Sequence, residues 1–211
     1  MLFNRNSLLL YAVTDRSWTG KQTLYEQIED ALIGGVTCVQ LREKNLDEDS
    51  FMKEAVEIRE LCHRYNVPLL INDNIKVALQ SKADGIHVGQ DDIPVSKIRE
   101  MVDKDFIIGA TAKTIEQAQR AEAEGANYLG VGAVFASSTK KDAIRITNKQ
   151  LKEICASVSI PAVAIGGITL SNMTEISGCG MSGIAVVSAI FAADDIKMAT
   201  QELKKEVTYL I

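Results

Sequence analysis

The sequence has little of what several protein classes require. Basic residues number 23 against 28 acidic residues, so the net charge is −5 and the positive excess typical of nucleic-acid and membrane-surface binders is missing. No apolar run approaches the roughly 18 residues that a membrane span needs. The apolar stretch at residues 8–13 is too short for a secretory signal, and no small-residue cleavage site follows it. We therefore expect a cytoplasmic protein with no nucleic-acid or membrane partner.

Cysteine, histidine and proline are also scarce. The four cysteines lie far apart without a C-x-x-C pair, which predicts reduced and mostly buried thiols. Two histidines are too few for a histidine-rich metal site. Only three prolines occur, and neither a linker nor a change of composition divides the chain. We therefore predict a single domain that spans residues 1–211.

What recurs along the chain is a short apolar run followed by an amphipathic segment. Most of the runs do not alternate with polar residues, which is typical of parallel strands covered on both faces. The eight runs are residues 8–14, 36–41, 68–72, 85–88, 106–109, 128–132, 162–165 and 183–187.

The segments between the runs have helical periodicity and helix-capping signals. Leu151, Ile154 and Val158, for example, lie on one helical face. Capping boxes are predicted for three pairs, Thr23 with Glu26, Thr114 with Gln117 and Thr147 with Gln150. Eight strands and eight helices in strict alternation predict a closed (β/α)8 TIM barrel. The alternative is an open doubly wound sheet, but residues 14–20 lack the glycine-rich phosphate loop expected after its first strand.

In such a barrel the chemistry lies where the strands end, on one rim. Gln40, Arg42 and Lys44 come at alternate positions after the second run, so their side chains are expected to point the same way. Two cations and an amide suit a phosphate group, although ordinary surface charge explains them equally well in isolation.

Carboxylates follow the next two runs. Asp73 comes after the third run and Asp92 after the fourth, and these strands are neighbours in a barrel. Two carboxylates beside a phosphate suit Mg²⁺. Helix N-capping is the alternative, and it fits Asp91 better than Asp92. His87, inside the fourth run, is predicted to be structural.

Further anion-binding groups follow the later runs. Thr111 comes after the fifth run, and a polar loop with Lys140 comes after the sixth. Gly167 and Ser188 follow the last two runs, where barrels commonly bind a phosphate through backbone N–H groups. Two anion sites and a metal on one rim favour transfer from a diphosphate donor to a phosphate-bearing acceptor.

At these residues the sequence resembles the thiamine phosphate synthase family. The motifs appear in order over nearly the whole chain. They are Tyr11-Ala-Val-Thr-Asp15, Gln40-Leu-Arg-Glu-Lys44, Ile71-Asn-Asp73, His87-Val-Gly-Gln-Asp-Asp92, Ser138-Thr-Lys-Lys-Asp-Ala143 and Ala164-Ile-Gly-Gly-Ile168.

The resemblance implies a (β/α)8 barrel that joins a pyrimidine diphosphate to a thiazole phosphate with release of pyrophosphate. It implies Mg²⁺ as cofactor, held by Asp73 and Asp92, and two phosphorylated small molecules as partners. By resemblance, the diphosphate substrate contacts Gln40, Arg42, Lys44, Asn72, Thr111 and Lys140, with Arg42, Lys44 and Lys140 acting on the leaving group. The thiazole phosphate contacts Ser137, Ser138, Thr139, Gly167, Val187 and Ser188. The oligomeric state is not fixed by the sequence, and a homodimer is one candidate.

Departures from the family pattern bear on the alternatives. Thr111 stands where the family often has serine, and Lys113 where it often has histidine. The similar thiazole tautomerases rely on that histidine and have lost parts of the diphosphate and metal set, so this chain has the reverse pattern. A tautomerase or another phosphosugar-binding barrel remains one alternative, and a non-catalytic binder of thiamine precursors is the other.

Overall fold

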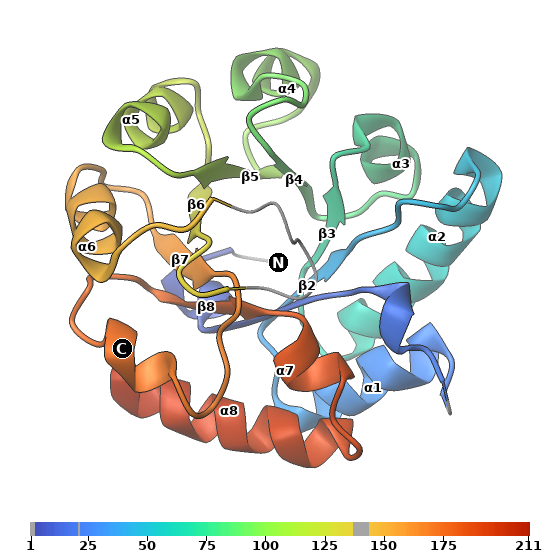
Figure 1. Cartoon of the computed structure of the whole chain (residues 1–211). Coiled ribbons are helices and arrows are strands. Elements are labelled where there is room, and N and C mark those ends of the chain that lie inside the picture. Colours follow the sequence, from blue (N-terminus) through green and yellow to red (C-terminus); the bar gives the residue numbers. More distant parts are fainter. Residues whose placement is uncertain (1–2, 21, 137–143) are drawn as a thin grey trace.

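The computed structural model describes residues 3–20, 22–136 and 144–211. In this part of the chain, parallel strands close into a barrel in which each strand pairs with the next and β8 returns to β1 (Figure 1). The predicted TIM barrel is therefore confirmed. The strands are β1 (Leu10–Val13), β2 (Cys38–Leu41), β3 (Leu69–Asn72), β4 (Gly85–Val88), β5 (Ile107–Ala112), β6 (Tyr128–Gly132), β7 (Ala162–Ile165) and β8 (Gly183–Val186).

Strand β5 is longer than the sequence pattern predicted. Thr111 pairs in register with Gly130, and Ala112 pairs with Val131. Thr111 therefore lies inside the strand, and the expectation that it follows the strand is wrong. The predicted run ended at Gly109 because the apolar character weakens there, whereas the backbone ladder with β6 continues for three more residues.

Helices surround the barrel (Figure 1). One α-helix follows each of the first six strands. They are α1 (Leu24–Gly34), α2 (Glu48–Arg64), α3 (Ile75–Gln80), α4 (Val95–Met101), α5 (Ile115–Ala123) and α6 (Asn148–Ala156). Short 3-10 turns, η1 (Arg5–Leu8) and η2 (Arg16–Trp18), flank β1.

The strict alternation breaks down at the end of the chain. β7 is followed by a single 3-10 turn, η3 (Met173–Ile176), and both α7 (Ser188–Phe191) and α8 (Ile196–Leu210) follow β8. The expected regular series of eight β-then-α units is wrong here. The helix expected after β7 is missing for a local reason. The Asn172 side chain donates to Gly167 O and accepts from Thr169 N, and these bonds favour a turn over a helix.

The capping signals are confirmed at two helices and half confirmed at a third. Thr23 with Glu26 and Thr147 with Gln150 form complete capping boxes. At α5, Thr114 caps the N–H of Gln117, but the Gln117 side chain accepts from the N–H of Lys113 instead. The helix is capped, while the reciprocal bond is displaced by one residue.

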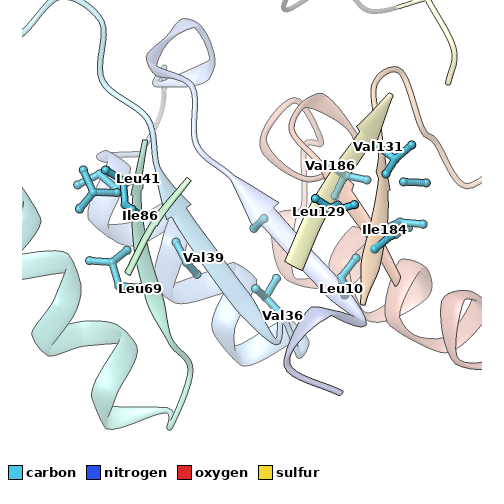
Figure 2. Packing of buried hydrophobic residues seen from close by; sticks show 14 of the residues in the cluster. Leu10, Val36, Val39, Leu41, Leu69, Ile86, Leu129, Val131, Ile184 and Val186 are labelled. Atoms are coloured by element: carbon cyan, nitrogen blue, oxygen red, sulfur yellow. The ribbon is translucent and has the colours of Figure 1, made fainter. Parts of the chain in front are cut away.

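Two apolar layers hold the barrel together, one on each side of the sheet. Leu10, Val39, Leu69 and Ile86 point outward to the helices (Figure 2). A second cluster fills the inside of the barrel. Its strand residues alternate along each strand with those that point outward. It contains Leu8, Tyr11, Val13, Cys38, Leu70, Ile107, Tyr128, Val163 and Ala185.

The four cysteines are free thiols, three of them buried, as predicted. Among the helices that the structure describes, none combines the length and apolar character required to cross a membrane.

Candidate active site

A pocket opens at the end of the barrel where the strands terminate. It collects seven of the predicted site residues, namely Gln40, Arg42, Asn72, Thr111, Gly167, Val187 and Ser188. It is also lined by Val13, His87, Lys113, Gly132, Ala133, Ile165, Gly166, Ile168, Ala185 and Val186. Residues from all eight strands thus meet at one mouth, as the parallel topology requires.

Arg42 and Lys44 each face a carboxylate. Arg42 Nη1 lies 3.2 Å from Asp15 Oδ2, and the Arg42 N–H donates to Thr14 Oγ1 at 2.9 Å. Lys44 Nζ lies 2.5 Å from Asp73 Oδ2. Gln40 and Arg42 share the pocket, whereas Lys44 is not among its lining residues. The expectation that the three side chains point the same way therefore holds for two of them.

Glu43, between these two cations in the sequence, turns away to a partly buried ion cluster. Arg16 Nε donates to Glu43 Oε2 at 2.9 Å, and Arg16 Nη2 also pairs with Glu54 of α2. Burial raises the pKa of Glu43 to about 7, and the nearby Glu54 carboxylate acts in the same direction while Arg16 opposes both. The cluster ties the loop after β2 to the loop after β1.

Asp73 and Asp92 come together, as the sequence predicted. Burial raises the pKa of Asp73, the adjoining Asp92 carboxylate raises it further, and Lys44 opposes the shift. Asp73 also adopts a left-handed φ of 60° and accepts a hydrogen bond from Asn72 Nδ2 at 2.7 Å. Asp92 Oδ2 accepts from the N–H of Gly89 at 2.7 Å.

Helix capping does not account for these carboxylates. The residue that caps α3 is Asn74, whose side chain accepts from Val77 N, and the N-cap of α4 is Pro94. Within residues 3–20, 22–136 and 144–211, no group of three or more His, Cys, Asp or Glu side chains could hold a metal. Any metal bound by the Asp73–Asp92 pair would take its other ligands from elsewhere, which is the usual behaviour of Mg²⁺ with phosphate oxygens and water.

The part of the pocket wall that follows β7 and β8 consists mainly of backbone groups. Gly166 and Gly167 have φ values of +103° and +63°, and a Cβ atom on Gly167 would lie 2.1 Å from Ala136 O. In the described part of the chain, the N–H groups of Gly167, Ile168 and Ser188 have no hydrogen-bond acceptor. All three residues line the cavity, where unpaired backbone N–H groups suit an anion.

The floor of the pocket is a chain of buried polar side chains. Gln40 Nε2 donates to Tyr11 Oη at 2.7 Å, and Tyr11 Oη lies 2.8 Å from Tyr128 Oη. Tyr128 Oη lies 2.8 Å from His87 Nδ1, and His87 Nε2 lies 3.0 Å from Thr111 Oγ1. Burial lowers the pKa of His87 to about 4, so the ring is neutral near pH 7.

Sequence reasoning missed several of these residues. The sequence pattern gives Tyr11 no role, places Tyr128 in a strand and does not predict that Lys113 lines the pocket. His87 was assigned a structural role, whereas it both packs in the barrel and lines the pocket. The available signal was the presence of polar side chains inside otherwise apolar strands, since such groups need buried partners.

Four of the predicted residues, Ser137, Ser138, Thr139 and Lys140, lie outside the described residues. Ala136, the last described residue before them, contacts the Gly167 turn.

Comparison with known proteins places these features in one family. A family described as thiamine monophosphate synthase matches residues 10–190. The chain is 42% identical over 203 residues to the thiamine-phosphate synthase of Clostridium botulinum, covering 96% of this chain and 95% of that one. It is 47% identical over 203 residues to that of Methanobrevibacter smithii, covering 96% and 97%. The solved structure of thiamine phosphate pyrophosphorylase from Pyrococcus furiosus superposes with a TM-score of 0.91 at 39% identity, covering 98% of each chain.

Proposed function

Since the chain belongs to the thiamine monophosphate synthase family, whose enzymes form thiamine phosphate, we propose the substrates and the order of steps by which it does so. It condenses 4-amino-2-methyl-5-(diphosphooxymethyl)pyrimidine with 4-methyl-5-(2-phosphoethyl)thiazole and releases pyrophosphate. The observation that carries the proposal is the single pocket with a cationic and amide wall at Gln40 and Arg42 and a backbone N–H wall at Gly167 and Ser188.

The two walls suit two different anions. Arg42, Lys44 and Lys140 bind the diphosphate, with Asn72 and Thr111 positioned beside it. Arg42 and Lys44 already have carboxylate partners, so they are held in place before the diphosphate arrives. The phosphate of the thiazole binds to the N–H groups near Gly167 and Ser188, together with Ser137, Ser138 and Thr139.

Asp73 and Asp92 fit Mg²⁺, because they supply hard oxygen ligands from two neighbouring strand ends, and the Asp92 carboxylate raises the pKa of Asp73 although Lys44 lies beside it. When bound there, Mg²⁺ would neutralise charge on the diphosphate.

In the proposed reaction, the bond between the pyrimidine methylene carbon and the diphosphate oxygen breaks first. The electron pair leaves with pyrophosphate, and the amino group on the ring stabilises the cation that remains. The thiazole nitrogen then donates its electron pair to the methylene carbon. Arg42 and Lys44 stabilise the departing charge, and no side chain of the enzyme forms a covalent bond.

The test is pyrophosphate release in the presence of both substrates and Mg²⁺. We expect Arg42→Ala to lower kcat/KM by roughly 10²–10³-fold, as removal of one charge-stabilising donor does. Lys97→Ala is the matched control, because Lys97 is an exposed cation that pairs with Glu100 on the surface of α4. Unchanged turnover in Arg42→Ala would overturn the assignment.

The same assay separates the alternatives raised by the sequence. A thiazole tautomerase would convert its thiazole without releasing pyrophosphate, and a non-catalytic binder would bind thiamine phosphate without turnover.

A further inference from the structure

The ion cluster formed by Arg16, Glu43 and Glu54 contains two carboxyl groups for one cation. The Arg16 guanidinium of η2 donates to Glu43 Oε2 through Nε at 2.9 Å and to Glu54 of α2 through Nη2. The Glu43 side chain is 3% exposed and the Glu54 side chain 17%. If both carboxyl groups were ionised, Arg16 would balance only one of the two negative charges in a place with little water, which is costly.

Each carboxyl group also has an oxygen without a partner. Glu43 Oε1 and Glu54 Oε2 are buried and accept no hydrogen bond from the described residues. Arg16 binds the other oxygen of each group, and the two groups lie within hydrogen-bonding reach of each other. Two carboxylates repel, whereas a carboxylic acid donates to a carboxylate. One proton between Glu43 and Glu54 therefore satisfies both remaining oxygens and leaves one negative charge for Arg16 to balance.

The cluster is part of a double connection between the segments that follow β1 and β2. Asp15 pairs with Arg42, and the next residue of each segment pairs with the charges reversed, Arg16 with Glu43. Glu54 adds a contact from α2. The segment after β2 is thus attached to two other elements through Glu43.

Glu43 lies in the sequence between the two cations proposed to bind the diphosphate. Arg42 lines the pocket, and Lys44 Nζ lies 2.5 Å from Asp73 Oδ2. Because Glu43 is bonded covalently to both residues, its attachment to Arg16 fixes the backbone from which the two cationic side chains extend. A loss of that attachment would move both cations.

We propose that Glu43 and Glu54 share one proton and that this carboxyl pair, held by Arg16, makes Glu43 a positioning residue for Arg42 and Lys44. Loss of the proton leaves two carboxylates that repel each other, so the segment after β2 loosens and the diphosphate binds more weakly. This inference rests on the proposed function for the identity of the ligand.

The pH at which the proton is lost follows from the surroundings of Glu43. The charged groups that act most strongly on it are Arg16 of η2 and Glu54 of α2, while the cations on its own segment pair with other carboxylates. Burial and Glu54 raise the pKa of Glu43 to about 7, and Arg16 opposes them. The carboxyl pair therefore keeps its proton at pH 6 and has lost it at pH 8.

The shared proton can be observed without any ligand. In protein labelled with ¹³C at the glutamate carboxyl carbons, we expect one NMR resonance to titrate with a midpoint near pH 7. This resonance should be missing in Glu43→Gln. Its midpoint should be lower in Glu54→Gln, because the amide carries no negative charge. A Glu43 carboxyl group that stays ionised from pH 5 to pH 8, or a midpoint unchanged in Glu54→Gln, would overturn the proposal.

Positioning is tested by the binding of pyrophosphate with Mg²⁺, measured by calorimetry at pH 6 and pH 8. Pyrophosphate itself titrates in this range, so the Kd of the wild type is divided by the Kd of Glu43→Gln at the same pH. The glutamine amide donates to Glu54 at every pH and replaces the shared proton. We expect a ratio near 1 at pH 6 and about fivefold at pH 8, because only the wild type loses the bond. Glu43→Ala should raise the Kd roughly tenfold at both pH values.

The matched control is Glu60→Gln, which alters a mostly exposed carboxylate on the same helix as Glu54. Its Kd should equal that of the wild type at both pH values. If the ratio of the wild type to Glu43→Gln is the same at pH 6 and pH 8, the proposal is wrong. It is also wrong if Glu43→Gln, folded by thermal melting, binds as weakly as Glu43→Ala. Failure of the proposed function is seen separately, as absence of pyrophosphate release by the wild type, and leaves the NMR result intact.

Discussion

Arg42 forms an ion pair with Asp15, and the sequence pattern predicts a site role for Arg42 but not for Asp15. Arg42 follows a strand in a row of polar residues, which is a visible signal. Asp15 belongs to another strand end, and its pairing depends on how β1 and β2 are aligned, with Val13 opposite Gln40. Residues at strand ends could therefore be predicted, whereas the partners they contact depend on register.

Glu43 gives a pH dependence at the residue scale. Its pKa rises from 4.5 to about 7 on folding, so between these values the folded chain keeps a proton that the unfolded chain has released. The free energy of unfolding should therefore decrease as the pH rises from about 5 to 7. Urea denaturation across this pH range should show that the free energy of unfolding decreases less steeply in Glu43→Gln than in the wild type. Glu100→Gln, at a mostly exposed carboxylate, should keep the wild-type slope; an unaltered slope in Glu43→Gln would contradict the prediction.

Gly167 tests the backbone wall of the pocket. An alanine there would have a left-handed φ and a Cβ atom 2.1 Å from Ala136 O, so the turn must shift. We expect Gly167→Ala to raise the KM for the thiazole phosphate roughly tenfold or more, with a smaller change for the pyrimidine diphosphate, in steady-state kinetics. Gly20→Ala serves as the control, because a Cβ atom at Gly20 meets nothing within 4 Å. Equal changes in the KM values for the two substrates would contradict the proposal that they bind to different walls of the pocket.

At the scale of elements, apolar runs predicted the strands well because parallel strands in a barrel are buried on both faces. The segment after β7 was not predicted. It carries polar turn formers whose preference for a turn comes from side-chain contacts with Gly167 and Thr169. Such contacts are set by the fold and leave no periodic pattern in the sequence.

The cap of α6 yields a prediction at this scale. Thr147 accepts from Gln150 N, and Gln150 Oε1 accepts from Thr147 N, so both ends of the box are engaged. Thr147→Ala should lower the free energy of unfolding by about 1 kcal/mol in urea denaturation. Thr208→Ala, at an exposed threonine near the end of α8, should change it by less than about 0.5 kcal/mol. A Thr147→Ala variant as stable as the wild type would show that the cap contributes nothing.

For the whole molecule, ligand binding should be visible as thermal stability. If Asp73 and Asp92 hold Mg²⁺ with pyrophosphate, adding both should raise the Tm of the wild type, because a ligand that binds the folded state stabilises it. Asp92→Asn should lose the part of the increase that depends on Mg²⁺. Asp91→Asn, at the adjacent exposed aspartate, should keep it. A Tm increase in Asp92→Asn equal to that of the wild type would remove Asp92 from the metal site.

The pairing of β1 with β8 has a consequence for synthesis on the ribosome. The first strand to emerge has one of its two hydrogen-bonding neighbours among residues 183–186, near the other end of the chain. Until those residues leave the exit tunnel, the nascent sheet has two open edges, which invite pairing with other chains. Translation that stalls before β8 would therefore leave an aggregation-prone intermediate with open sheet edges. Chaperones and proteases would be needed to refold or degrade it.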